Sequence, residues 1–352
     1  MLDPNARRQV PLFVCATLLS LAAALSATAV AAPAYQITDR WQLGGTGGWD
    51  YLTVESARHR LFLSRGDHVD VVDTTSGKVV GRIGPTAGVH GVALAPDLGR
   101  GFTSNGKSNS ITEFNLETLA VLRDVPIAGE NPDAILYEAG HHRLYVFNGR
   151  SRDALVLDAG TLAIVKKLPM PDKPEFAQDD GHGHVYVNIE SEHGQLLRID
   201  TATLAIDAVW DLPGCASPSG LALDRAHQRL FSVCDGKVMA VTDAATGRQV
   251  ARVAIGEGPD AVEYDAAQGL VFSSNGEGTL TVVRQDSADR YHVLTQLPTQ
   301  KGARTMALDP ATRRVYLVTA AFGAAPAATE EQPHPRPAIL PDSFTVLVAA
   351  PH

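Results

Sequence analysis

A sequence repeat constrains the fold of this chain more than any other feature. Seven segments each combine a strand of alternating apolar and polar residues, a turn, and a second apolar strand that carries an aromatic residue. Two of them, NPDAILYEAGHHRLYVFNGRS at 131–151 and GPDAVEYDAAQGLVFSSNGEG at 258–278, match at corresponding offsets. The aromatics recur every 40 to 45 residues, at Phe62, Phe102, Tyr145, Tyr186, Phe231, Phe272 and Tyr316. A fixed period of this length indicates an array of identical structural units.

Each repeat is expected to contain four short strands. Tripeptides such as Thr-Ser-Gly at 75–77 and Ala-Thr-Gly at 245–247 provide a turn before the fourth strand. The period of two excludes helical repeats, and four strands per unit is typical of propeller blades. We therefore predict an all-β fold, a seven-bladed β-propeller. The last repeat ends with only a third strand, at 343–350, so the segment 35–45 should complete that blade and close the ring.

The N-terminus has the pattern of a secretory signal peptide. Arg7 and Arg8 precede a long apolar run, and small residues at Ala31 and Ala32 offer a cleavage site. An uncleaved membrane anchor is the alternative, because the run is nearly long enough to span a bilayer. We expect residues 1–32 to be the signal peptide, residues 33–352 to form one domain, and the mature protein to be periplasmic.

Composition limits the classes of partner. The chain is 45% hydrophobic, enough for a full core, and carries a net charge of −9. A surface of this sign repels nucleic acid and anionic lipid, so a nucleic-acid partner is disfavoured. We expect a monomer that contacts the membrane only during export.

The second strands LYVFN, VYVN and VYLVT are similar to the YVTN-type repeat. Over residues 35–350 the chain resembles YncE-like bacterial periplasmic propellers. This resemblance implies the propeller architecture. It does not imply one activity, because related propellers include binding scaffolds, lactonases and lyases.

The ends of the first two strands of each repeat place polar residues at one mouth of the central channel. First strands begin at Asp50, His90, Asp133, Pro174 (with Glu175 beside it), Ser219, Asp260 and Arg304. Second strands end at Arg65, Asn105, Asn148, Ile189, Cys234, Asn275 and Thr319. The predicted ligand-binding residues are Asp50, His90, Asn105, Asp133, Asn148, Asp260, Asn275 and Arg304. Oxygen ligands converging on an axis suit Ca²⁺ or another divalent cation, with Asp133 and Asp260 as the candidate ligands. The alternative is that these Asp and Asn residues only cap turns.

Two functions remain open at this mouth. The first is a non-catalytic scaffold that binds a small molecule, a peptide or a partner protein. The second is a metal-assisted lactonase or lyase, with His90 or Glu175 as the general base. The sequence has no Ser-His-Asp nucleophile signature, P-loop or dinucleotide fingerprint. His182 and His184 are weaker metal candidates, because their turn should lie on the opposite face.

Two further features depart from the repeat. Cys215 and Cys234 are the cysteines left after removal of Cys15 with the signal peptide, and strand pairing should bring both to one face. We predict a disulfide between them, with two free thiols as the alternative. Residues 320–342 form a Pro- and Ala-rich insertion in the last repeat. It is either a simple loop or a lid over the channel mouth.

Overall fold

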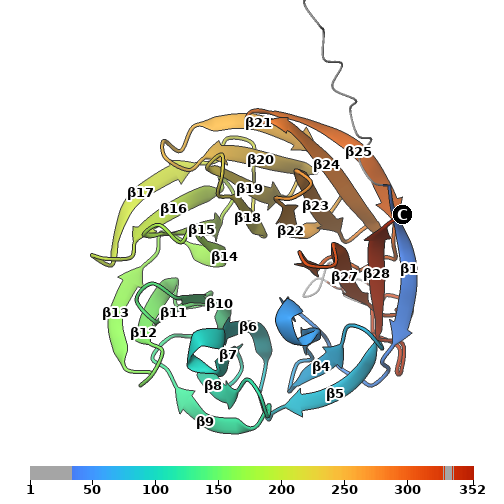
Figure 1. Ribbon diagram of the computed structural model, residues 1–352, viewed down its shortest axis with the longest axis horizontal. Helices are drawn as coiled ribbons and strands as arrows, with labels where there is room; N and C mark the ends of the chain where they lie inside the picture. The colour runs from blue at the N-terminus through green and yellow to red at the C-terminus, as the bar shows by residue number, and fades with distance from the viewer. Residues whose placement is uncertain (1–33, 328, 330–334, 336) are drawn as a thin grey trace, which may run out of the picture. The chain divides into compact units, whose positions relative to one another are not determined.

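The computed structural model describes residues 34–327, 329, 335 and 337–352. These residues form seven four-stranded antiparallel sheets arranged as blades around a ring (Figure 1). The predicted all-β, seven-bladed β-propeller is therefore confirmed. The predicted signal peptide at 1–32 lies outside the described residues. Within the described part of the chain, no helix has the length and apolar character needed to cross a membrane.

The blades run in chain order, and each places its first strand innermost. The innermost strands are β2 (Leu52–Glu55), β6 (Val89–Ala95), β10 (Pro132–Glu138), β14 (Lys173–Asp179), β18 (Leu221–Asp224), β22 (Pro259–Asp265) and β26 (Met306–Asp309). The second strands are β3 (Arg60–Ser64), β7 (Arg100–Asn105), β11 (Arg143–Asn148), β15 (His184–Glu190), β19 (Arg229–Cys234), β23 (Leu270–Asn275) and β27 (Arg314–Thr319).

The outer half of each blade follows the same order. The third strands are β4 (Val69–Asp73), β8 (Ser110–Asn115), β12 (Asp153–Asp158), β16 (Gln195–Asp200), β20 (Val238–Asp243), β24 (Thr279–Ser287) and β28 (Thr345–Pro351). The outermost strands are β5 (Lys78–Ile83), β9 (Val121–Pro126), β13 (Ile164–Pro169), β17 (Ala205–Asp211), β21 (Gln249–Ala254), β25 (Arg290–Pro298) and β1 (Tyr35–Gln42). Short 3₁₀ turns follow β2 and β6, at Ser56–Arg58 and Pro96–Leu98.

The N-terminal strand closes the ring, as the sequence predicts. Strand β1 pairs antiparallel with β28, from Tyr35 opposite Pro351 to Gln42 opposite Thr345. Tyr35 contacts Phe272 of blade six edge to face, with ring centroids 4.9 Å apart. The first and last strands of the described chain therefore share one sheet, and β1 supplies the outermost strand of blade seven.

The hydrophobic core lies between blades rather than within one layer. The aromatic of every second strand is buried, with at most 2% of its surface exposed. Seven clusters of buried apolar residues each join two neighbouring blades around the whole ring. Each blade thus buries both of its faces against its neighbours, which explains why one isolated repeat would not be stable.

The same hydrogen bond from the backbone to a side chain recurs in four of the turns between third and fourth strands. An aspartate carboxylate accepts a hydrogen bond from the backbone N–H three residues later, at 2.7–2.9 Å. The four pairs are Asp73 with Ser76, Asp158 with Thr161, Asp200 with Thr203, and Asp243 with Thr246. In the first, Gly77 follows with φ +68°, and an added Cβ would lie 2.6 Å from the Trp41 ring. Glycine is therefore required there both for its conformation and for the packing of Trp41.

The predicted disulfide is present in blade five. Cys215 and Cys234 are both fully buried and are bonded to each other, with their Cα atoms 5.1 Å apart. The loop folds back through an antiparallel bridge, in which the Asp235 N–H donates to the Ala216 carbonyl over 2.9 Å. The cross-link therefore joins the loop before β18 to the end of β19.

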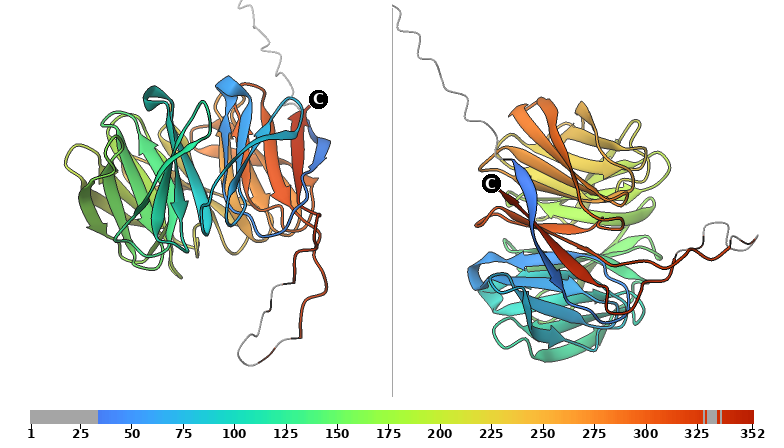
Figure 2. Two further views of the ribbon diagram at one scale, coloured as in Figure 1. Left: turned by 90° about the horizontal axis from the view of Figure 1, so that it is seen from below. Right: turned by 90° about the vertical axis from the view of Figure 1, so that its right-hand side faces the viewer.

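The insertion in blade seven begins on a short two-stranded stem. Phe322 and Ile339 form an antiparallel bridge, and the Gly323 N–H donates to the Ala338 carbonyl over 2.8 Å. The two stem segments, 320–327 and 337–342, extend away from the blades (Figure 2). Figure 2 shows no described part of the insertion lying across the ring, so the lid stays a prediction.

Candidate functional site

Local irregularities in the innermost strands present polar side chains at one mouth of the channel. In four blades the pairing of the innermost with the second strand shifts register at the beginning of the strand. Such a bulge turns a side chain out of the regular alternation. The titratable residues within these shifts are His90, Asp133, Glu175 and Asp260. Asp50 and Arg304 precede β2 and β26 by two residues each.

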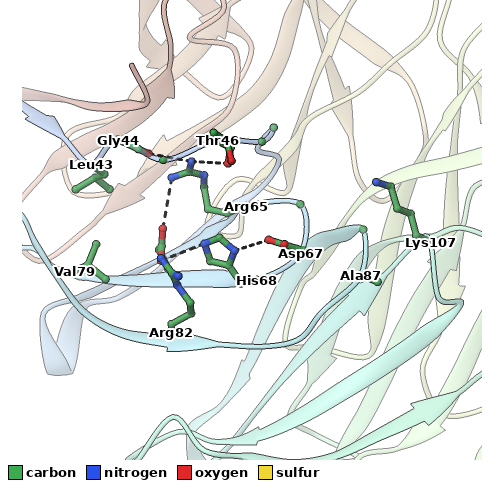
Figure 3. Close-up of a pocket in the computed structure, with 16 residues that line it drawn as sticks. Leu43, Gly44, Thr46, Arg65, Asp67, His68, Val79, Arg82, Ala87 and Lys107 are labelled. Atoms are coloured by element: carbon green, nitrogen blue, oxygen red, sulfur yellow. Dashed lines mark hydrogen bonds and ion pairs between the residues drawn. The ribbon is translucent and has the colours of Figure 1, made fainter. Parts of the chain in front are cut away.

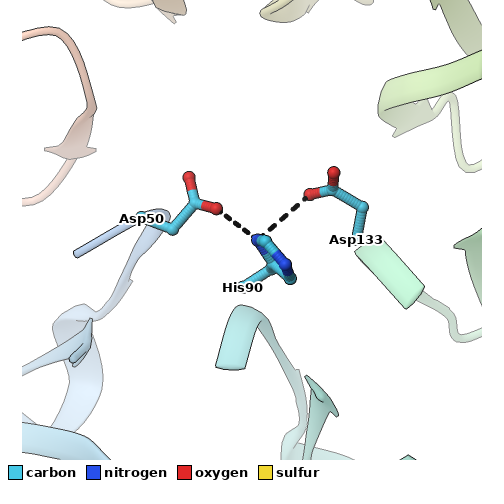
Figure 4. A group of neighbouring side chains, drawn as sticks. All are labelled: Asp50, His90 and Asp133. Atoms are coloured by element: carbon cyan, nitrogen blue, oxygen red, sulfur yellow. Dashed lines mark hydrogen bonds and ion pairs between the residues drawn. The ribbon is translucent and has the colours of Figure 1, made fainter. Parts of the chain in front are cut away.

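Asp50, His90 and Asp133 come together from three successive blades (Figure 4). His90 Nδ1 lies 2.5 Å from Asp50 Oδ2 and 3.7 Å from Asp133 Oδ1. One ligand atom from each residue lies within 4.8 Å of the others, so the three side chains could hold a metal ion. Asp133 is the most buried of the three, and Asp50 and His90 are half-buried.

Blade four contributes a second group of charges. Lys173 Nζ lies 2.8 Å from Glu175 Oε2 and also pairs with the Glu190 carboxylate at the end of β15. In blades six and seven, Arg304 Nη1 lies 3.0 Å from Asp260 Oδ2. We call these eight residues the channel mouth. They are Asp50, His90, Asp133, Lys173, Glu175, Glu190, Asp260 and Arg304.

Two aromatic side chains form a floor beneath the channel mouth. Tyr51 of blade one and Phe176 of blade four contact edge to face, with ring centroids 5.3 Å apart. The Tyr51 hydroxyl donates to Glu175 Oε1 over 3.3 Å. Because blades one and four are not neighbours in the ring, these contacts span the channel. A small cavity of 60 Å³ lies deeper, among the innermost strands of blades one to four.

Burial and crowding raise the pKa values of three carboxyl groups. Burial raises the pKa of Asp133 to about 6; the charge of His90 opposes this and that of Asp50 adds to it. Burial and the charge of Asp133 raise the pKa of Glu175 to about 8, against the influence of Lys173. Burial likewise raises the pKa of Asp260 to about 7, although Arg304 opposes the shift. These three carboxyl groups therefore exchange protons between pH 5 and 9, and their ionised forms are disfavoured by burial unless a positive charge lies beside them.

The same carboxyl groups also raise the pKa values of His90 and Tyr51. Burial lowers the pKa of His90, but its hydrogen bond with Asp50 and the charge of Asp133 outweigh burial, so its pKa is raised. Burial and the nearby Glu175 carboxylate raise the pKa of the Tyr51 hydroxyl. Tyr51 therefore stays a neutral hydrogen-bond donor at physiological pH.

The structure separates the predicted site residues into two sets. Asp50, His90, Asp133, Glu175, Asp260 and Arg304 lie at the channel mouth, whereas Asn105, Asn148 and Asn275 do not. The three asparagines are fully buried and bond within their own blades. Asn105 Nδ2, for example, donates to Thr112 Oγ1 over 2.8 Å. They differ from the prediction because each amide connects the second strand to the third instead of facing the channel.

The predicted metal pair also differs from the arrangement observed. Asp133 belongs to the group that could hold a metal ion, but its partners there are Asp50 and His90 rather than Asp260. Asp260 is paired with Arg304 instead. Counting positions at the strand ends could not reveal this, because it gives the place of a residue around the ring but not which side chains meet.

Sequence reasoning missed four residues of the site. Each lies within two residues of a counted position, and counting selects only one residue at each strand end. They are Tyr51, Lys173, Phe176 and Glu190. A rule that also examined the flanking residues would have found them.

The histidines of blade four are a separate case. His184 Nδ1 lies 3.1 Å from Asp180 Oδ2, and the two are partners within one turn. His184, Asp200 and Asp207 also lie close enough to hold a metal ion. Asp207, however, is exposed and pairs with Arg198 through both carboxylate oxygens. This second group lacks the burial that distinguishes the first.

The blades and the channel mouth define the chain as a seven-bladed β-propeller with a cluster of charged side chains at one end of its channel. Solved structures confirm the architecture at low sequence identity. A chain of Kuenenia stuttgartiensis hydrazine synthase is 16% identical, with a TM-score of 0.69 over 77% of this chain and 92% of that chain. U3-55K is 12% identical, with a TM-score of 0.72 over 89% of this chain and 98% of its own.

The same fold appears in WD40 proteins. The RRP9 WD40 repeats are 13% identical, with a TM-score of 0.72 over 90% of this chain and 98% of that chain. A chain of the mitotic checkpoint complex is 13% identical, with a TM-score of 0.71 over 96% and 99%. No protein-family model and no curated protein matches the sequence. These likenesses show a WD40-type propeller fold alone.

Proposed function

We propose that this protein is an exported, non-catalytic propeller that binds a cationic group at its channel mouth. The group belongs to a small molecule, or to a lysine or arginine side chain of a peptide or partner protein. The observation that carries the proposal is the convergence of carboxylates from blades one, three, four and six on one mouth of the channel, with Asp133 buried and the others half-buried. Burial raises the pKa values of Asp133, Glu175 and Asp260, and a bound cation would stabilise their ionised forms.

Geometry and charge both support this class of ligand. Five carboxylates line the mouth, against Lys173, Arg304 and His90. Lys173 and Arg304 are each already paired with an acid, which leaves Asp50 and Asp133 facing His90. A guanidinium or ammonium donor fits between carboxylate oxygens through charge-assisted hydrogen bonds. The Tyr51–Phe176 floor provides an apolar surface for the part of the ligand that carries the charge.

Three observations support export and a binding role. The N-terminal residues have the signal-peptide pattern, the repeat resembles YncE-like periplasmic propellers, and the Cys215–Cys234 disulfide suits an oxidising compartment. A protein partner is supported by WD40 propellers of similar fold, one of them from a mitotic checkpoint complex.

A matched pair of small peptides tests the proposal. N-acetylarginine amide carries the guanidinium, and N-acetylcitrulline amide has nearly the same shape without the charge. Calorimetric titration at pH 8 should show saturable binding of the arginine compound only. Asp133→Asn should weaken that binding about tenfold or more, as expected for the loss of a charge-assisted hydrogen bond. Asp39→Asn on the exposed face of β1 makes the same change in charge and should leave binding unchanged.

Two results would refute this function. One is equal binding of the charged and neutral peptides. The other is equal weakening by Asp133→Asn and Asp39→Asn. In either case the charge of the channel mouth would not determine binding.

A metal-assisted lactonase or lyase is the second candidate, and the Asp50–His90–Asp133 group favours it. Two carboxylates and an imidazole suit Zn²⁺ or Mn²⁺ better than Ca²⁺, which prefers oxygen ligands. Glu175, whose pKa is about 8, would then supply or accept a proton near neutral pH. Elemental analysis of purified protein distinguishes the two functions. A stoichiometric metal that is lost in His90→Ala but kept in His292→Ala would favour the enzyme.

A further inference from the structure

A second cavity opens beside blade one and is separate from the channel mouth. Its volume is 720 Å³, large enough for a small organic ligand. One wall is the glycine-rich segment 43–48, which links β1 to β2. The other walls come from the turn after β3, the end of β5, and the loops before β6 and after β7 (Figure 3). We call it the basic pocket, with Arg65, His68, Arg82 and Lys107 as its basic residues.

The basic pocket has more basic side chains than acidic ones to pair with them. Buried Asp70 lies 3.5 Å from Arg65 Nη1, 3.0 Å from Arg82 Nη2 and 3.4 Å from His68 Nε2. Asp67 contacts the other ring nitrogen, His68 Nδ1, at 2.6 Å. Two carboxylates thus share two arginines and a histidine. Lys107 is exposed, and its Nζ pairs with no acid in the described part of the chain.

The pocket also has backbone and side-chain donors without acceptors. Among the described residues, no acceptor faces the backbone N–H groups of Thr46, Gly47 and Gly48, and Gly47 has φ +96°. Successive free N–H groups in a glycine-rich turn form a concave site for anions. Arg65 is almost completely buried, yet its Nε–H likewise has no acceptor among the residues that the structure describes. A buried donor of this kind is stabilised when an acceptor reaches it.

We propose that the basic pocket binds the anionic group, a carboxylate or a phosphate, of a small ligand. Lys107 and the 46–48 amides would contact the anion, whereas Arg82, Leu43 and Val79 lie at the end of the cavity away from Lys107 (Figure 3). The inference is independent of the channel mouth, because none of the eight mouth residues lines this pocket. Its failure would leave the proposed function untouched.

Three aromatic probes of similar size test this inference. Phenyl phosphate and benzoate carry the two anions, and benzyl alcohol is the neutral counterpart. Titration of the full chain should show saturable binding of at least one anion and none of the alcohol. The anion that binds more tightly identifies the ligand chemistry.

Substitutions at Lys107 locate the binding. Lys107→Glu should weaken the affinity for the anion at least tenfold, and Lys107→Arg should retain it. Lys166→Glu, on the exposed outer strand β13, makes the same change in charge and should have little effect. Thermal melting checks that all variants are folded. The proposal is overturned if neither anion binds saturably, or if Lys107→Glu and Lys166→Glu weaken binding equally.

Discussion

The hydroxyl of Tyr51 in blade one donates a hydrogen bond to Glu175 in blade four over 3.3 Å, across the channel of the propeller. Phe176 contacts the same tyrosine ring. The bond therefore links two blades that share no hydrophobic cluster, and it spans the channel beside the polar mouth. It also holds Glu175 beside Lys173, so that the acids of the mouth have fixed positions before a ligand arrives.

Folding stability should fall as the pH rises from about 5 to 9. Glu175 and Asp260 have pKa values raised to about 8 and 7, from ordinary values of 4.5 and 3.8. Over this interval the folded state retains protons that the unfolded state has released, so the free energy of unfolding decreases with rising pH. Thermal melting across this range measures the effect.

A neutral variant isolates the contribution of one carboxyl group. Glu175→Gln should remove part of the pH dependence, on the order of 1–3 kcal/mol at pH 9, because the carboxyl group no longer ionises inside the protein. Glu117→Gln replaces an exposed carboxylate and should leave the slope unchanged. A Glu175→Gln curve parallel to that of the wild type would contradict the raised pKa.

The buried asparagines should support stability rather than binding. Asn105→Ala removes bonds to Ser110 Oγ and Thr112 Oγ1 and leaves buried groups unpaired. We expect unfolding to become easier by about 1–3 kcal/mol. The affinity for the arginine peptide should not change. Chemical denaturation and titration of the same sample measure both quantities, and weakened binding without destabilisation would return Asn105 to the ligand site.

Closure by β1 should be essential. A chain that begins at Trp49 lacks the strand paired with β28 and the Trp41 ring that packs on Tyr316, with centroids 5.6 Å apart. It exposes an unpaired strand edge, so we expect aggregation or a melting temperature lowered by many degrees. A chain that begins at Tyr35 keeps β1 and is the control. Equal melting of the two chains would show that closure adds no stability.

The disulfide should stabilise blade five. Cys215 and Cys234 are separated by 19 residues, and cross-links of this length contribute up to about 3 kcal/mol. Replacing both residues by Ala should lower the unfolding free energy by that amount or less, since neighbouring strands already restrain the loop. Mass analysis after alkylation checks the bond itself. Two alkylated cysteines in the unreduced native protein would contradict it.

The architecture was predictable because it is a property of the whole pattern. The number of blades follows from seven aromatics at a regular period, and the closure follows from the outer strand that the last repeat lacks. Neither depends on the conformation of the loops. The position of Cys234 at the end of its strand likewise predicted its partner. These features need only strand order and pairing, which the alternation of residues specifies.

The site was only partly predictable, because side-chain direction depends on local irregularity. The bulge in β14 presents Glu175 rather than the counted Pro174, and no period reveals it. Asn105 lies at the end of a second strand, where the repeat predicts a residue of the channel mouth, but hydrogen bonds hold its amide inside the blade. The contact of Tyr51 with Glu175 joins residues of non-neighbouring blades, so it exists only once the ring is closed.

The pH dependence of ligand affinity shows whether the carboxylates of the channel mouth bind the cation. The guanidinium of N-acetylarginine amide keeps its charge throughout, so only the protein titrates between pH 5 and 9. Asp133, Asp260 and Glu175, with pKa values of about 6, 7 and 8, lose their protons over this range. We predict that the affinity measured by calorimetry rises about tenfold or more from pH 5 to pH 9. An affinity that stays constant, or falls, while the protein remains folded would contradict it.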